Sequence, residues 1–231
     1  MSRRKVAILI SGRGSNMSAL IDACRCEDFP AEIVRVISNR PGAPGLDLAR
    51  RAGIATATVD HTTFESRDAF DAALDQALRE AGAELVCNAG FMRLLGEAFV
   101  AGWRDRQLNI HPSLLPSYRG LHTHERVLHD GVRITGCTVH FVRTEMDAGP
   151  IVAQAAVPVC GDDTPDTLGA RVLDAEHRLY PEALRLVASG AARVVGEKVI
   201  IPAGKRVPPS LYSPGAEAAG PGAGPEQAGH S

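Results

Sequence analysis

The sequence lacks the features of an exported, membrane-bound or zinc-stabilised protein. Its five cysteines are an odd number, and no two of them have Cys-x-x-Cys spacing. Neither a disulfide framework nor a structural zinc site is therefore expected. No charged start precedes a long apolar run, and the longest early apolar stretch, Val6 to Ile10, is only as long as a strand. These absences predict a cytoplasmic protein without a membrane segment.

The chain also lacks an excess of charge of either sign. It has 25 Lys and Arg against 27 Asp and Glu, for a net charge of -2 at pH 7. This balance gives no general electrostatic reason to expect nucleic-acid binding. With 231 residues, 45% of them hydrophobic, the chain can form one sizeable α/β domain. Residues 213–231 contain mostly Pro, Gly, Ala and Glu without periodicity, so we expect a single domain over 1–212 and a disordered tail.

Strand-like and helix-like segments alternate through the first half of the chain, a pattern typical of a doubly wound, mostly parallel sheet. The apolar residues Phe70, Leu74 and Leu78, for example, are four apart and would share one helix face. We expect strands at 5–10, 32–38, 56–59, 85–89 and 107–110, with helices at 16–26, 46–52 and 67–81.

The second half changes character. Segments 136–142 and 151–159 are rich in β-formers and are separated by an Asp-Ala-Gly-Pro turn, which predicts an antiparallel hairpin added to the sheet. A long amphipathic helix is expected over 164–188, with Thr164 as its cap and Pro165 as its first residue. A final strand pair is expected over 192–201.

A glycine loop follows the first predicted strand and opens a helix, in the order Gly12-Arg13-Gly14-Ser15-Asn16. Its glycines permit a tight turn, and free N–H groups at a helix start attract anions. There is no Gly-Lys-Ser/Thr ending, and no third glycine or acidic ribose partner is present where a dinucleotide site needs them. The loop therefore predicts a cradle for a single phosphate, and the alternative is a plain tight turn with a Ser or Asn cap.

Asn109 and His111 are two apart before Pro112, so in an extended segment their side chains point to one side. At the end of a buried strand such a pair could donate hydrogen bonds to an oxyanion that forms during acyl transfer. Asp147, in the turn of the predicted hairpin, would favour the protonated imidazolium and orient it as a general acid. The alternative for Asp147 is that it serves only the turn.

Three other histidines have simpler interpretations. The His122-Thr123-His124 sequence has the His-x-His spacing of some metal sites, but no matching carboxylate or cysteine partners are evident. We predict no metal, and hydrogen bonding to substrate or backbone instead. His140 lies within a β segment and is expected to be a satisfied core histidine. Asn88 is a polar residue on a buried strand and needs a hydrogen-bond partner that the sequence does not identify.

Several segments resemble the signature segments of the glycinamide ribonucleotide formyltransferases, a family of folate-dependent enzymes. The resemblance runs from about Val6 to Tyr212, and the Asn-x-His-Pro-Ser-Leu-Leu-Pro segment is shared with related formyl-transfer and formyl-hydrolysis enzymes. The matching segments are 10–16, 89–95, 108–116, 120–124, 147–151 and 176–181. The resemblance implies a Rossmann-like formyltransferase fold with antiparallel C-terminal strands.

The resemblance also implies a reaction and its participants. The amine of glycinamide ribonucleotide would attack the formyl carbon of 10-formyltetrahydrofolate, in purine synthesis, without a metal. Asn109, His111 and Asp147 match the catalytic residues, with Asp147 acting partly through water. Positions that match the ribonucleotide site are Gly12, Arg13, Gly14, Ser15, Asn16, Pro112, His122 and Glu176. Positions that match the folate pocket are Arg67, Met92, Arg93, Leu94, Leu95, Asn109, Arg143, Thr144, Glu145, Met146 and Asp147.

Other functions fit the sequence less well. A methionyl-tRNA formyltransferase would need an RNA-binding domain after Tyr212, and a formyltetrahydrofolate hydrolase a regulatory domain before Val6. A phosphate-binding module without activity would leave Asn109, His111 and Asp147 without a purpose, and a nicotinamide dehydrogenase lacks its glycine fingerprint. The expected partners are the ribonucleotide and a reduced folate, with no nucleic acid or membrane, and the protein is expected to be a monomer or homodimer.

Overall fold

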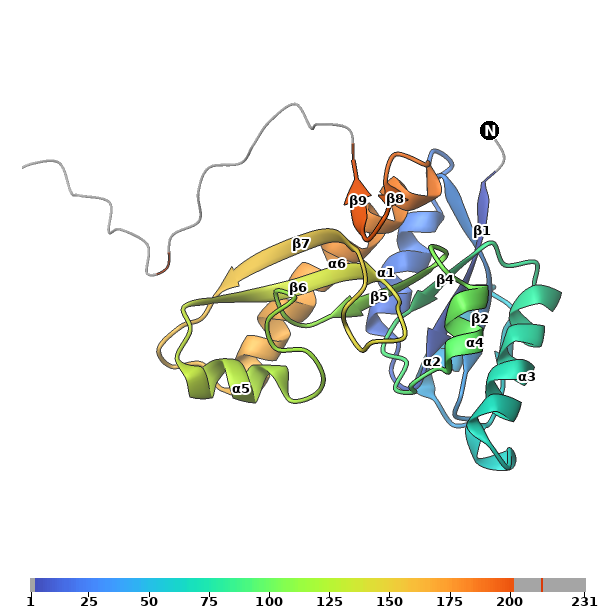
Figure 1. The fold of residues 1–231 in the computed structure, drawn as a ribbon, viewed down its shortest axis with the longest axis horizontal. Coiled ribbons are helices and arrows are strands. Elements are labelled where there is room, and N and C mark those ends of the chain that lie inside the picture. Colours follow the sequence, from blue (N-terminus) through green and yellow to red (C-terminus); the bar gives the residue numbers. More distant parts are fainter. Residues whose placement is uncertain (1–2, 202–212, 214–231) are drawn as a thin grey trace, which may run out of the picture.

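A seven-stranded sheet forms the centre of the computed structural model, which describes residues 3–201 and 213 (Figure 1). The strands lie in the order β3-β2-β1-β4-β5-β6-β7. Neighbours from β3 to β5 are parallel, whereas the β5–β6 and β6–β7 pairs are antiparallel, which confirms the predicted fold class. Their bounds are β1 Arg4–Ile10, β2 Ala31–Ser38, β3 Thr56–Thr58, β4 Leu85–Asn88, β5 Gln107–His111, β6 Ile134–Phe141 and β7 Ile151–Pro158.

Helices connect and cover these strands. Every helix and strand expected from the sequence is present, with ends that differ by no more than two residues. The helices are α1 Ser15–Cys24, α2 Pro44–Arg51, α3 Arg67–Glu80, α4 Glu97–Gly102, α5 Thr123–Asp130 and α6 Pro165–Ala188, with a short 3₁₀ turn at His61–Thr63. The expected final strand pair forms a separate two-stranded sheet of β8 Arg193–Val195 and β9 Lys198–Ile200.

Two of these helices, α4 and α5, were not predicted. The buried residues of α4 are the adjacent Phe99 and Val100, and α5 buries only Thr123 and Val127. Neither helix therefore carries an apolar stripe long enough to be read as a helical period.

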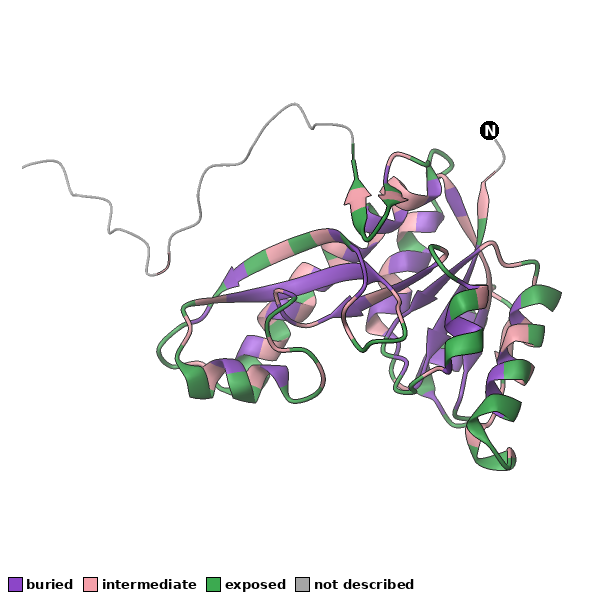
Figure 2. Cartoon of the chain, in the orientation of Figure 1, coloured by how far each residue is buried: buried purple, intermediate pink, exposed green. Residues whose placement is uncertain are grey.

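The alternation of strand residues places apolar side chains on both faces of the sheet. In β1, Val6, Ile8 and Ile10 pack into the core that α1, α2 and α6 cover, while Ala7 and Leu9 face α3 and α4. Figure 2 shows the central strands buried along their length. Burial on both faces explains why β1 has an unbroken apolar run instead of alternating polarity.

The antiparallel strands extend beyond the parallel part of the sheet (Figure 1). A third apolar cluster forms there, where Val127 of α5 packs with Cys137 of β6, Val157 of β7 and Leu168 of α6. The start of α6 is fixed by its cap, as predicted. Thr164 accepts from the Thr167 N–H, and Thr167 in turn accepts from the Thr164 N–H.

The predicted domain end at residue 212 and the predicted tail at 213–231 lie outside the described residues, apart from Ser213. Within the part of the chain that the structure describes, no helix is both long and apolar enough to span a bilayer.

Candidate active site

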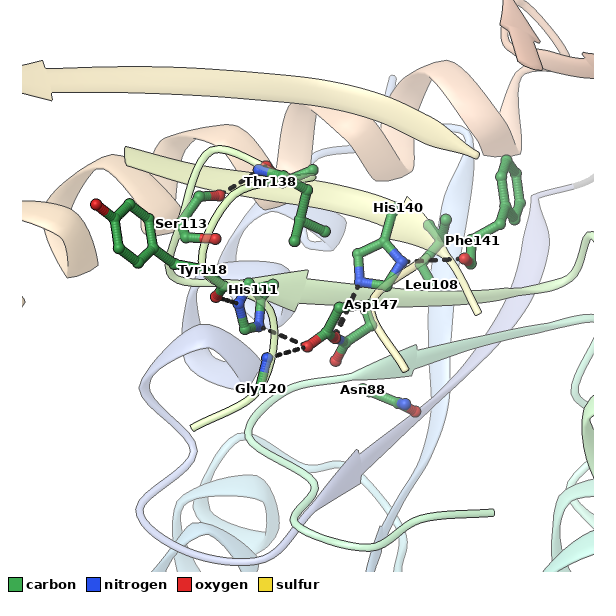
Figure 3. Close-up of polar contacts among 12 residues, drawn as sticks. Asn88, Leu108, His111, Ser113, Tyr118, Gly120, Thr138, His140, Phe141 and Asp147 are labelled. Carbon is green, nitrogen blue, oxygen red and sulfur yellow. Dashed lines mark hydrogen bonds and ion pairs between the residues drawn. The ribbon is translucent and has the colours of Figure 1, made fainter. Parts of the chain in front are cut away.

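His111 and Asp147 meet at the carboxyl end of β5. His111 is the last residue of β5, and Asp147 lies in the loop between β6 and β7. The His111 Nδ1 is 3.3 Å from the Asp147 Oδ2, and the two side chains are only 7% and 10% exposed (Figure 3). Asp147 is thus more than a turn residue, although its backbone also adopts a left-handed φ of 53°.

Both nitrogens of His111 face acceptors. Its Nε2 donates to the Tyr118 carbonyl at 2.8 Å, and its Nδ1 faces the Asp147 carboxylate. The same Asp147 oxygen accepts a 2.9 Å hydrogen bond from the Gly120 N–H. A neutral imidazole has one N–H, so only the imidazolium can donate to both acceptors. The Nδ1 proton is the one that a substrate beside Asp147 could receive.

His140 is a site residue that the sequence interpretation missed. It is buried, as a core histidine would be, but β6 pairs it directly with Asn109 across the sheet. The Asn109 amide nitrogen lies 3.2 Å from His140 Nε2, and His140 Nδ1 lies 3.0 Å from the Phe141 carbonyl. An Asn109 donor requires Nε2 to be the acceptor, so the Nδ1–H donates to Phe141 and the ring is neutral.

Burial agrees with this neutral form, because it lowers the pKa of His140. His140 Nε2 also lies 3.7 Å from Asp147 Oδ1. His140 thereby fixes the amide of Asn109, whose second N–H has no acceptor among residues 3–201 and 213. The available sequence signal was a histidine seven residues before Asp147 on a strand of the predicted hairpin.

The polar residue on β4 has a partner after all. Asn88 pairs with Asn109 in the β4–β5 register, and its side-chain oxygen accepts from the Gln107 amide at 3.1 Å. Tyr180 of α6 lies against the same two strands, with its hydroxyl 3.0 Å from the Asn88 carbonyl and 3.2 Å from that of Leu108. These bonds satisfy buried polar groups just below the site.

The glycine loop starts α1 without a side-chain cap. Its N-cap is Gly14, with a left-handed φ of 76°, so the alternative of a Ser or Asn cap is wrong. Gly45 approaches closely enough to donate a 3.0 Å hydrogen bond to the Gly12 carbonyl, where a Cβ on Gly45 would lie 2.9 Å from the same oxygen. The first N–H groups of α1 therefore remain available to an anion.

Asn16 and Glu176 join this loop to α6. The Asn16 amide donates to Glu176 Oε2 at 2.7 Å, and both side chains are buried. Burial raises the pKa of Glu176 to about 7, although the Asn16 hydrogen bond opposes that shift. Among the described residues, the buried Asn16 Oδ1 has no hydrogen-bond partner. A buried acceptor without a partner is costly, and a ligand donor would satisfy it.

Exposed apolar side chains lie on two loops that border the site. Met92 and Leu94 follow β4, and Met146 precedes Asp147. The Met92 N–H donates to Ser11 at the end of β1 at 2.8 Å. Arg67 lies beside the same β4 loop, with its Nε 3.7 Å from the position that a Cβ on Gly96 would take. An apolar part of a ligand could cover these exposed side chains.

Two predicted binding residues have other partners. The Arg143 guanidinium binds Asp105 at 2.7 Å and Glu197 at 2.9 Å, so its side chain is not free for a folate. His122 is 76% exposed and lies 3.6 Å from Glu125, at the start of α5. The Arg143 side chain is therefore occupied by two carboxylates, whereas His122 is exposed and its ligand contact stays a prediction.

Potential metal ligands do not gather in the described residues. No group of three or more His, Cys, Asp or Glu side chains in 3–201 and 213 is arranged to hold an ion. His124 is half-buried, and burial lowers its pKa.

Comparison with known proteins identifies the family. A model of the family described as formyl transferase matches residues 4–184. The chain belongs to the formyl transferase family. This membership confirms the resemblance that the signature segments indicated, and it accounts for the fold around His111.

Among members of this family, the chain is 44% identical over 208 residues to phosphoribosylglycinamide formyltransferase of Escherichia coli, covering 90% of this chain and 98% of that one. It is 55% identical over 190 residues to trifunctional purine biosynthetic protein adenosine-3 of Gallus gallus, covering 82% of this chain. The alignment spans only 19% of that longer relative. The crystal structure of glycinamide ribonucleotide transformylase 1 from Symbiobacterium toebii superposes with a TM-score of 0.84 at 47% identity, covering 86% of this chain and 94% of that one.

Proposed function

We propose that this chain transfers the formyl group of 10-formyltetrahydrofolate to the amine of glycinamide ribonucleotide, giving formylglycinamide ribonucleotide and tetrahydrofolate in de novo purine synthesis. The observation that carries the proposal is the His111–Asp147 pair beside the Asn109 amide, at the carboxyl edge of the sheet. The names of the full-length bacterial relative and of the solved structure agree with this reaction.

The ribonucleotide side is formed by the glycine loop. Its phosphate would accept hydrogen bonds from the free N–H groups of Gly14, Ser15 and Asn16 at the start of α1. The sugar hydroxyls or the glycinamide amide can donate to the buried oxygen of Asn16, which lacks a partner among the described residues. Glu176 lies next to that oxygen and can accept a further donor. Arg13 is exposed at the loop and adds a cation near the phosphate.

The folate side is formed by the loops after β4 and β6. The faces of the pterin and aryl rings are flat, and they would cover Met92, Leu94 and Met146, which are otherwise exposed. The polar edge of the pterin needs hydrogen-bond partners. The backbone of residues 92–95 and 143–147 offers hydrogen-bond groups at the same edge. Arg67 and Arg93 are the cations of this side that could attract the acidic end of the cofactor.

The chemistry follows from the groups between these two sides. The ribonucleotide amine attacks the formyl carbon, a C–N bond forms, and the carbonyl oxygen gains negative charge. The free N–H of Asn109 and the Nδ1–H of His111 donate to that oxygen. Collapse breaks the bond from the formyl carbon to folate N10. One proton leaves the amine and one reaches N10, and the His111–Asp147 pair relays them directly or through water.

We further propose that the chain acts on these two small molecules as a monomer or homodimer in the cytoplasm. The net charge of -2 gives no general attraction for nucleic acid. His111 and Asp147 meet within one chain, so a monomer already contains this pair.

The test mixes the purified full chain with glycinamide ribonucleotide and 10-formyltetrahydrofolate and follows the absorbance of the deformylated folate. Release that requires the ribonucleotide and yields one formylated product per folate supports the proposal. Release without the ribonucleotide would instead indicate a formyl hydrolase. Tight binding of either substrate without release would indicate a module without catalytic activity.

A further inference from the structure

A turn between β5 and α5 has an unusual backbone. Tyr118, Gly120 and His122 all have positive φ angles, of 55°, 81° and 56°. Glycine adopts this region freely, whereas a bulky side chain such as tyrosine does so only at an energetic cost. A left-handed tyrosine persists only where its surroundings hold it, and such positions gather at functional sites. We call residues 118–122 the left-handed turn.

The left-handed turn holds both partners of the ionic pair through its backbone. The Tyr118 carbonyl accepts from His111 Nε2 at 2.8 Å, and the Gly120 N–H donates to Asp147 Oδ2 at 2.9 Å (Figure 3). That carboxylate oxygen is the one that faces His111 Nδ1. A shift of the turn would therefore rotate the imidazole and move the carboxylate at the same time.

Side chains of α5 hold the turn. The Arg126 guanidinium donates to the Arg119 carbonyl at 2.7 Å, and it lies 5.4 Å from the centre of the Tyr118 ring. One helical turn later, Asp130 accepts from the Tyr118 hydroxyl at 3.0 Å. Arg126 and Asp130 are four apart and so share one face of α5. Arg126 thus joins the side chain of the strained residue to the backbone that follows it.

We propose that Arg126 is a positioning residue for the formyl-transfer reaction: it keeps the left-handed turn in the conformation that orients His111 and Asp147. The inference rests on the proposed function for its catalytic consequence. Arg126 contacts neither His111 nor Asp147 and acts only through the turn. Its partner Tyr118 supplies both a carbonyl for His111 and a ring for the guanidinium.

The test compares Arg126→Ala with Arg133→Ala, which removes another exposed arginine just beyond α5. Arg126→Ala is expected to lower kcat about tenfold, because small displacements of reacting groups are costly. The KM values for both substrates should stay within twofold. Arg126→Lys keeps a cation over Tyr118 and one donor for the Arg119 carbonyl, so it should recover most of kcat.

A second measurement needs no substrate. In protein labelled with ¹⁵N-histidine, the His111 Nε2–H that donates to Tyr118 should give a proton signal that exchanges slowly with water. This signal should broaden or vanish in Arg126→Ala and persist in Arg133→Ala. If Arg126→Ala does not fold, Arg126→Met preserves the aliphatic stem and removes the donor.

Parent-like kcat together with an unchanged His111 signal in the folded variant would overturn the proposal. Equal losses in Arg133→Ala would do so too, since they would reflect surface charge alone. The two proposals fail separately: a parent chain without formyl transfer contradicts the proposed function, whereas the His111 signal tests the turn in either case.

Discussion

The glycine-loop side and the His111 side of the site treat their polar groups in opposite ways. At the glycine loop, α1 starts without a side-chain cap and the buried Asn16 oxygen lacks a partner among the described residues. Around His111, both ring nitrogens face acceptors, and Asp147 receives a backbone N–H as well. Unfilled hydrogen-bond capacity suits the binding of a ligand, while filled capacity fixes the orientation of groups that must act. The first side is built to bind and the second to react.

The largest expected loss of activity is on the reacting side, at His111. His111→Ala should lower kcat by about 10³-fold, because it removes a positioned proton donor. The KM for glycinamide ribonucleotide should change little, since the glycine loop and Glu176 remain. Steady-state kinetics with each substrate varied separately would measure both. His129→Ala, at an exposed position on α5, is the control. Near-normal turnover in His111→Ala would remove this residue from the mechanism.

Asp147→Asn tests the charge on the reacting side. An amide is a weaker acceptor than a carboxylate and carries no charge, so it would hold His111 Nδ1 less firmly than Asp147 does at 3.3 Å. We expect kcat to fall about 10²-fold, because His111 loses its orientation. Asp162→Asn removes an exposed carboxylate before α6 and should leave kcat unchanged. A folded Asp147→Asn variant with the parent kcat would contradict the pairing.

On the binding side, Glu176→Gln should raise the KM for the ribonucleotide about tenfold and change kcat less, because one hydrogen-bond acceptor becomes an amide. Initial rates over a range of ribonucleotide concentrations, in the parent and in Glu176→Gln, would give the two KM values and test this. Glu182→Gln, exposed on the same helix, is the matched control. A loss confined to kcat would place Glu176 on the reacting side instead.

Glu176 also gives a stability signature. Burial raises its pKa to about 7 in the folded chain, from an ordinary value of 4.5. The folded state therefore holds this proton to higher pH than the unfolded state does. The contribution of this group to the free energy of unfolding falls as pH rises from about 4.5 to about 7. Urea unfolding at pH 5 and pH 8 should show a smaller difference between the two pH values in Glu176→Gln than in the parent.

The smallest effect is expected at the apolar edge. Leu94 is 65% exposed, so Leu94→Ala should leave the unfolding free energy nearly unchanged. It should raise the KM for the folate about threefold, through the apolar area that the ligand no longer covers. Val195→Ala, at a similarly exposed position on β8, should change neither. An unaltered folate KM in Leu94→Ala would indicate that the folate does not contact the loop after β4.

Local patterns predicted much of this molecule. The apolar run before Gly12, the helix caps and the spacing of Phe70, Leu74 and Leu78 gave the order and limits of most elements. Asn109 and His111 were identified because alternation along a strand fixes the side on which both point. The helices α4 and α5 were not predicted because each buries too few apolar residues to show a helical periodicity. His140 was not identified as a site residue because its position opposite Asn109 depends on the register between β6 and β5, which neither strand determines alone.

By itself, the sequence determined the alternation of strands and helices, the place of the glycine loop at the start of a helix and the family signature, since each depends on neighbours in the chain. Only the tertiary structure decided which distant groups meet. In the folded chain, Arg143 forms ion pairs with Asp105 and Glu197. Asn16 binds Glu176, 160 residues away, and His140 lies against Asn109. Such contacts depend on strand order, register and loop conformation. These arise when the whole chain buries its apolar faces at once, and no short segment encodes them.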